Sequence, residues 1–201
     1  MKTMLTLTTA ALLATTSLAL AQTSNGMNTQ DSGQAAPMQQ APAAADATAA
    51  ETKVDTATFI KTVPGANAFE IESSKLALTK ASSDDVKAFA QMMVDDHTTA
   101  GEDFKAALEK VQITSATKPS GEPMDAKQQA MMDELKAADG DAFEAKYIAM
   151  QTDAHKQAVA LFSAYANSGD DPALKEFAKA TLPTLKMHEK KVKELAAKHQ
   201  G

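Results

Sequence analysis

The sequence predicts an all-α protein, folded as an up-down four-helix bundle with a small extra helix in the middle crossover. Long stretches carry apolar residues at steps of three and four, which mark one face of an amphipathic helix. Short segments of Gly, Pro, Ser and Asp separate these stretches. Aromatic residues make up only 4% of the chain, and β-branched residues do not alternate with polar ones, so no strand is expected.

Residues 1–21 are predicted to be a secretory signal that is cleaved near Ala21-Gln22. Lys2 gives a positive start, residues 4–20 are apolar or hydroxylic, and Ala19-Leu20-Ala21 is the small-x-small pattern expected at a cleavage site. Threonines interrupt the apolar run, which falls short of the ~20 residues of a membrane-spanning helix. We therefore expect a periplasmic or otherwise exported protein with no transmembrane segment in the mature chain.

Residues 22–54 are predicted to form a disordered tether, and residues 55–199 the bundle domain. The tether is rich in Ala, Gln, Pro and Thr and has few large apolar side chains. Such a segment cannot bury enough surface to offset its chain entropy. The chain has no cysteine, which excludes disulfides and a lipid-modified N-terminal cysteine.

The first half of the domain is predicted to form an antiparallel helical hairpin. Asp55 is a suitable N-cap for a short helix over residues 56–63, which Pro64-Gly65 is expected to end. A longer helix should then run to about Ala81. Its apolar stripe is predicted to consist of Phe69, Glu72, Leu76 and Thr79. After a short connection, a second helix over residues 84–111 carries His97 on its apolar face.

The second half is predicted to begin with a loop at residues 114–123 and a weak helix at residues 125–138. A strong helix should follow from Asp141 to about Asn167, with His155 pointing inward or to the edge of the interface. Pro172 suits the first position of the last helix. The heptad spacing of that helix places His188 in the core seam.

The histidines and two acids on these helices form a candidate metal site. At ~1.5 Å of rise per residue, the members on paired helices lie at similar depths from their connections. One ligand per helix would come from Glu72, His97, His155 and His188, with Glu70 as a substitute for Glu72. The ion would be iron, copper or zinc. Methionines near the histidines would also suit Cu(I), although Met more often fills gaps in a core.

The alternative is a set of neutral core histidines, bonded to each other, to Glu72 or to backbone. The positions three before the histidines hold Val94, Thr152 and Leu185, so the Glu-x-x-His pattern of carboxylate-bridged di-iron bundles is absent. The His-x-x-x-His pair of zinc proteases is absent as well.

Composition excludes several other functions. The net charge is −6, and it becomes more negative once Lys2 leaves with the signal. Nucleic-acid binding, which needs cationic patches, is therefore not expected. No Gly-x-Ser-x-Gly elbow or glycine-rich phosphate loop occurs. We predict no catalytic residue and favour a role other than that of an enzyme.

Three blocks of the sequence together resemble a known family. They are FEIESSKLALTKASSDDVKAFAQMMVDDH at residues 69–97, FEAKYIAMQTDAHKQAVALF at residues 143–162 and LKEFAKATLPTLKMH at residues 174–188. Over roughly residues 56–195 the chain resembles the exported bacterial proteins called domain of unknown function 4142. The resemblance implies a ferritin-like helical bundle in the cell envelope and supplies no activity.

Two hypotheses of function follow. The first is an exported envelope bundle without enzymatic activity, which acts in stress tolerance through a protein partner. The second is a ferritin-like bundle that binds iron, copper or zinc with one ligand per helix. The metal content of the purified protein distinguishes them.

Overall fold

The structure is a computed structural model, which describes residues 53–111 and 124–199. These residues lie within one compact unit, Thr48–Gly201. The predicted signal at residues 1–21, nearly all of the predicted tether at residues 22–54 and the predicted loop at residues 114–123 lie outside the described residues. They therefore remain predictions.

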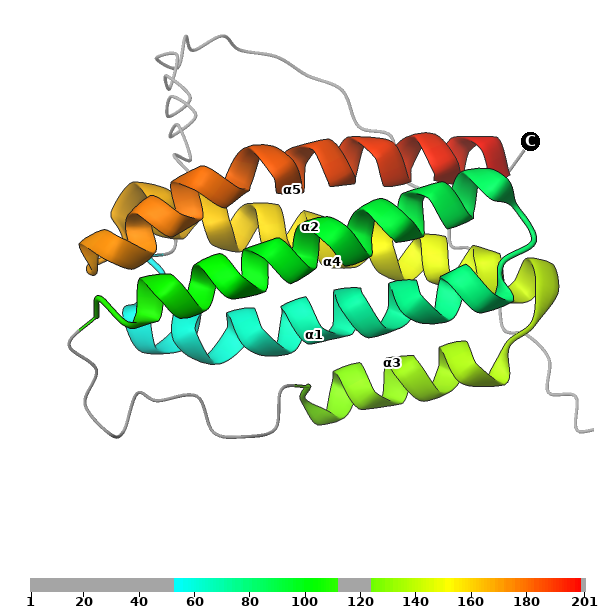
Figure 1. The fold of residues 1–201 in the computed structure, drawn as a ribbon, viewed down its shortest axis with the longest axis horizontal. Helices are drawn as coiled ribbons and strands as arrows, with labels where there is room; N and C mark the ends of the chain where they lie inside the picture. The colour runs from blue at the N-terminus through cyan, green and yellow to red at the C-terminus, as the bar shows by residue number, and fades with distance from the viewer. Residues whose placement is uncertain (1–52, 112–123, 200–201) are drawn as a thin grey trace, which may run out of the picture. The chain divides into compact units, whose positions relative to one another are not determined.

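The described part of the chain consists of five helices and no strand, which confirms the predicted all-α bundle. The helices are α1 (Thr56–Lys80), α2 (Asp84–Leu108), α3 (Ala126–Ala137), α4 (Gly140–Ser168) and α5 (Pro172–His199). Figure 1 shows that α1 and α5 run in one direction along the bundle, while α2 and α4 run in the other. The short α3 belongs to the crossover between α2 and α4 and packs against α1 and α4. None of the described helices is both long and apolar enough to cross a membrane.

The expected break in the first helix is wrong, because α1 continues through Pro64. A proline inside a helix removes one backbone hydrogen bond and crowds the preceding turn. Residues on both sides of Pro64 are buried, including Phe59 and Val63 before it and Phe69 after it. Burial of one continuous face of α1 in the bundle outweighs the local cost of the proline.

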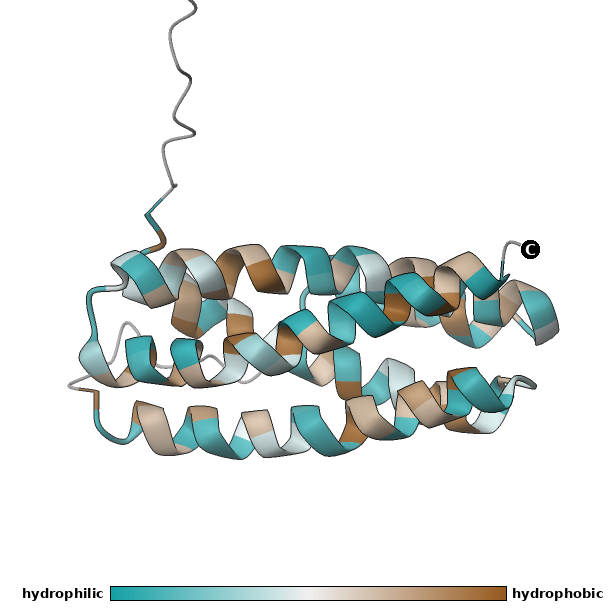
Figure 2. Ribbon diagram, turned by 90° about the horizontal axis from the view of Figure 1, so that it is seen from above, coloured by the Kyte–Doolittle hydropathy of each residue, from teal (hydrophilic) through white to brown (hydrophobic). Residues whose placement is uncertain are grey.

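The core of the bundle has two hydrophobic clusters. One cluster surrounds Phe89, Phe143 and Tyr147 and includes residues next to the connection between α1 and α2. The other surrounds Phe59, Phe162 and Phe177 and includes residues next to the connection between α4 and α5. Every helix carries both hydrophobic and hydrophilic residues along its length, as expected for the amphipathic helices of a bundle (Figure 2). The three buried histidines belong to neither cluster.

The connection between α1 and α2 is fixed by a buried acid from α4. Glu144 Oε1 accepts hydrogen bonds from the backbone N–H of Ser82 at 2.6 Å, the Ser82 hydroxyl at 2.8 Å and the backbone N–H of Ser83 at 2.8 Å. Burial alone would raise the pKa of Glu144, but these hydrogen bonds outweigh it and lower the pKa. Glu144 therefore holds the first hairpin against α4 as a carboxylate.

Candidate metal centre

Three helices bring His97, His155 and His188 together in the middle of the bundle. His97 comes from α2, His155 from α4 and His188 from α5, and their exposed fractions are 6%, 1% and 1%. The ring centroids are 5.7 Å apart for His97 and His155, 5.4 Å for His97 and His188, and 5.3 Å for His155 and His188. One ring nitrogen from each histidine lies within 4.8 Å of the other two. The three imidazoles thus form a nearly equilateral triangle.

Each histidine uses one ring nitrogen to bond a group outside this triangle. Nδ1 of His97 lies 3.0 Å from Asn67 Oδ1, and Nδ1 of His155 lies 2.9 Å from the backbone oxygen of Gln151. Nε2 of His188 lies 2.8 Å from Asp96 Oδ2. All three partners are oxygens that accept hydrogen bonds, so in each neutral ring the bonded nitrogen carries the proton.

The remaining nitrogens are therefore lone-pair acceptors without a donor. They are Nε2 of His97, Nε2 of His155 and Nδ1 of His188, and each is buried with no hydrogen-bond partner within the described ranges. A buried acceptor without a partner costs about 1–3 kcal/mol. Three such acceptors on adjacent rings form a set that an electron-pair acceptor, such as a metal ion, would satisfy.

The electrostatics of the centre keep these lone pairs free of protons. Burial lowers the pKa of His155 to about 4, and the backbone bond to Gln151 opposes this only in part. Burial, together with the charges of the two neighbouring histidines, lowers the pKa of His97 well below its usual range. Burial lowers the pKa of His188 as well, although Asp96 acts in the opposite direction. All three rings are neutral at pH 7, the form that binds a metal.

The acid expected to join the histidines does not lie among them. The sequence predicts Glu72 on the buried stripe of α1, but its side chain is 49% exposed and forms an ion pair with Lys75 at 2.9 Å. The buried stripe instead passes through Glu70, Ser73 and Ser74. Glu70, the substitute for Glu72, is 5% exposed.

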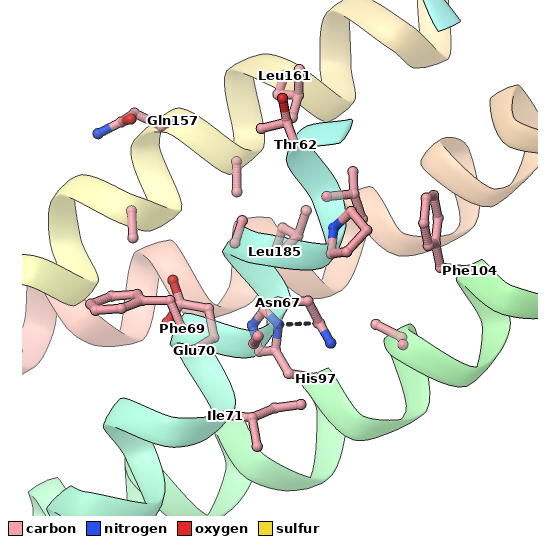
Figure 3. Close-up of a pocket in the computed structure, with 18 of the residues that line it drawn as sticks. Thr62, Asn67, Phe69, Glu70, Ile71, His97, Phe104, Gln157, Leu161 and Leu185 are labelled. Atoms are coloured by element: carbon pink, nitrogen blue, oxygen red, sulfur yellow. Dashed lines mark hydrogen bonds between the residues drawn. The ribbon is translucent and has the colours of Figure 1, made fainter. Parts of the chain in front are cut away.

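Glu70 lines a cavity of about 990 Å³ together with two of the histidines. The lining includes His97, His155 and Asn67, along with apolar residues such as Leu161 and Leu185. Figure 3 shows Glu70 and His97 at this cavity, with the hydrogen bond between His97 and Asn67. Oε2 of Glu70 is buried and has no hydrogen-bond partner in the part of the chain that the structure describes. Burial raises the pKa of Glu70 to about 8, and the side chain of Gln151 opposes this shift.

Sequence reasoning did not identify the groups that orient the histidines. Asn67 precedes the predicted stripe, Asp96 stands directly before His97 in an acidic pair, and neither residue was predicted to contact a histidine. Asp96 nevertheless reaches across to α5, and its side chain is 37% exposed. Gln151 contacts His155 through its backbone oxygen, which every residue type has, so the sequence could not predict this contact. Both bonds join residues that are far apart in the sequence, 30 positions for Asn67 and His97 and 92 for Asp96 and His188, so no local pattern indicated them.

The model of the family described as Domain of unknown function (DUF4142) matches residues 39–195. Among curated proteins, none matches this chain. The solved structure described as "CopM in the Cu(II)-bound form" is similar, with a TM-score of 0.60 and 17% sequence identity over 73% of this chain and 98% of that chain. At this identity the likeness concerns the fold alone.

The family match covers most of the chain, including α1 to α4 and nearly all of α5. It contains all three histidines of the centre. The chain belongs to the family described as Domain of unknown function (DUF4142).

Proposed function

We propose that this protein binds one transition-metal ion through His97, His155 and His188, and that copper is the preferred ion. The single observation that carries the proposal is the convergence of three buried histidines, each of which has one unpartnered ring nitrogen and offers one ligand nitrogen within 4.8 Å of the other two. The opposite nitrogen of each ring is bonded to a protein oxygen, as is usual for histidines that ligate metals.

The distances suit a metal after a small adjustment of the rings. A metal–nitrogen distance of about 2.0–2.1 Å separates the nitrogens of a three-histidine site by about 3.3–3.6 Å. The nitrogens here lie within 4.8 Å of each other, so modest ring rotations would complete the site. Rings held by one hydrogen bond each can rotate in this way without repacking of the helices.

The donor set favours copper or zinc over iron. Imidazole ligands suit copper and zinc, and at a site of given ligands divalent copper binds more tightly than the other first-row divalent ions. No carboxylate joins the three nitrogens in the described residues. Iron in helical bundles is bound largely by carboxylates. The description of the similar solved structure as a Cu(II)-bound form also favours copper as the first ion to test.

The location of the protein is part of the proposal. The N-terminal signal predicted at residues 1–21 would deliver the bundle to the periplasm or another site outside the cytoplasm. A buried site with three neutral ligands would hold copper there, in a role of storage, buffering or delivery to an envelope partner.

The experiment is metal analysis of the protein after purification without chelator, followed by titration of the metal-free protein with Cu(II), Zn(II) and Fe(II). We expect one equivalent of copper or zinc per chain, and loss of that equivalent in the His97→Ala, His188→Ala double variant. His199→Ala is the matched control, because His199 lies at the end of α5, away from the centre. Equal binding by the double variant and the wild type would overturn the proposal and restore a purely structural role for the histidines.

A further inference from the structure

The cavity connects the surface of the bundle with two of the three histidines. Its lining contains exposed residues, among them Glu102, Lys105 and Lys127, as well as the buried His97 and His155. His188 is not part of the lining. An ion held by the three rings would therefore be closed off on the side of His188 and open toward the cavity.

Glu70 is a buried acid without a charged partner in the part of the chain that the structure describes. It forms no ion pair with any of the described residues, and its Oε2 atom has no hydrogen-bond partner among them. Its neighbours on the buried stripe are satisfied: Ser74 bonds the Tyr147 hydroxyl at 2.9 Å, and Ser73 accepts a hydrogen bond from Gln151 Nε2 at 3.0 Å. The side chain of Gln151 acts on the carboxyl group and lowers its pKa, so the atom that lacks a partner is Oε2.

The position of Glu70 relative to the histidines can be read from the helices. Glu70 follows Asn67, the partner of His97, by three residues on α1, and Gln151 precedes His155 by four residues on α4. Because α1 and α4 are antiparallel, both steps run the same way along the bundle (Figure 1). At ~1.5 Å per residue, the backbone of Glu70 lies about one helical turn, ~5 Å, from the level of the histidines.

No oxygen of Glu70 belongs to the group of ligand atoms that lie within 4.8 Å of one another, so Glu70 suits a bridged contact with the ion better than a direct metal–oxygen bond. A ligand atom bound to the ion would lie about 2 Å from it, and a hydrogen bond would add about 2.8 Å. Both together give about 5 Å. A small molecule on the ion could therefore reach both the metal and the carboxyl group.

We propose, building on the metal site above, that the cavity admits a small univalent anion to a fourth coordination position on the ion, and that Glu70 donates a hydrogen bond to this anion. Three protein ligands and one open position are the arrangement of metal sites that bind exogenous ligands. Oε2 of Glu70 is buried beside this cavity without a partner, and in its protonated form the carboxyl group has an O–H to donate. Glu70 is thus a positioning residue for the exogenous ligand and not a ligand of the metal.

The test is azide titration of the Cu(II)-loaded protein, followed by the azide-to-copper charge-transfer absorption and by electron paramagnetic resonance. We expect saturable binding of one azide per copper. Glu70→Leu should retain one copper and weaken azide binding about tenfold or more, because it removes a hydrogen-bond donor to a charged acceptor. Glu70→Gln retains an N–H donor at this position and should bind azide within about threefold of the wild type. Glu72→Leu, on the exposed side of the same helix, is the matched control and should change neither affinity.

The other outcomes contradict the inference in distinguishable ways. Loss of copper in both Glu70 variants would make Glu70 a metal ligand. Unchanged or tighter azide binding in Glu70→Leu would show that Glu70 does not donate to the anion. A copper-loaded wild type whose spectra do not respond to azide would show that the ion has no open position, while the metal site itself would stand. Failure of the metal to bind at all would instead refute the proposed function.

Discussion

Each of the three histidines has one ring nitrogen without a hydrogen-bond partner and one that is bonded to a protein oxygen. The three oxygens belong to different chemical groups. Asn67 offers an amide oxygen, Gln151 a backbone oxygen and Asp96 a carboxylate. The carboxylate stands apart because it strengthens the electron-pair donation of its histidine as well as orienting the ring. His188 should therefore be the strongest of the three ligands.

Substitution of Asp96 tests this difference. Asp96→Ala should weaken copper binding about 10- to 100-fold, the usual effect of losing the partner of a metal-bound histidine. Asp95→Ala is the control, because Asp95 is an exposed neighbour whose carboxylate accepts from Gln91 on the surface of α2. Competition titrations with a chromogenic chelator give both affinities. Equal affinities of the two variants would mean that Asp96 does not support His188 in the metal-bound state.

The same residues predict how acid affects the metal-free protein. The pKa of each histidine is lower in the folded state than the ~6.5 of an unfolded chain, and that of His155 is about 4. The unfolded chain therefore binds more protons below pH 6.5, and stability falls as the pH drops from about 6.5 toward 4. Glu70 acts in the opposite direction, because its pKa is about 8 in the folded protein, so its contribution to stability falls as the pH rises from about 4.5 to 8.

The three histidines lower the stability on acidification, and the single carboxyl group of Glu70 raises it, so the histidines should dominate. The melting temperature of the chelator-treated protein should therefore fall as the pH is lowered from about 6.5 to 5. The drop should be shallower in His188→Gln, which removes one of the imidazoles. It should be steeper in Glu70→Gln, which removes the opposing group. A melting temperature that stays level or rises on acidification would show that the histidines are charged or exposed in solution.

Among the helices, the connection between α1 and α2 depends on one side chain of α4. Glu144→Ala would leave the donors of Ser82 and Ser83 without their acceptor in a partly buried turn. We expect a loss of about 2–4 kcal/mol in the free energy of unfolding, measured by urea denaturation. Glu134→Ala, which removes an ion pair between exposed side chains with Lys146, should cost less than about 1 kcal/mol. A similar small cost for both variants would mean that Glu144 does not fix the hairpin.

Helix periodicity was sufficient to predict the helices of the bundle and the inward side of His97, His155 and His188. It failed on α1 for a physical reason. The buried face of α1 contains Ser73 and Ser74, because their small polar side chains bond groups from α4. A stripe drawn through large residues is rotated away from this face, so it included Glu72 and left Glu70 outside.

The predicted break at Pro64 is wrong because it considered only the local effect of proline on the helix. The burial of Phe59, Val63 and Phe69 against other helices was not considered. Two long-range features of the centre were also beyond the sequence. The bond from Asp96 to His188 joins residues 92 positions apart, and the tautomer of each ring depends on such a partner. One nitrogen of each ring can meet the others only if α2, α4 and α5 are rotated correctly about their own axes. Sequence periodicity predicts the buried face of each helix but not its rotation to better than about one residue.

In the molecule as a whole, the histidines form a polar layer that neither hydrophobic cluster includes. In the metal-free protein this layer holds three unpartnered acceptors. A ligand that binds only the folded state adds stability, about 2.7 kcal/mol at a free concentration 100 times its dissociation constant. Copper should therefore raise the melting temperature of the wild type, and it should have no effect on the His97→Ala, His188→Ala variant. An equal rise in both proteins would indicate binding elsewhere on the acidic surface.

The central claim is that three imidazole rings from α2, α4 and α5 bind a single ion. X-ray absorption at the copper edge of the loaded protein measures this most directly, because imidazole rings give a characteristic multiple-scattering pattern that can be counted. We predict three imidazoles at about 2.0 Å, and two in a His155→Ala variant that retains copper. A first shell of oxygen or sulfur ligands, or an imidazole count that does not change in His155→Ala, would contradict the account.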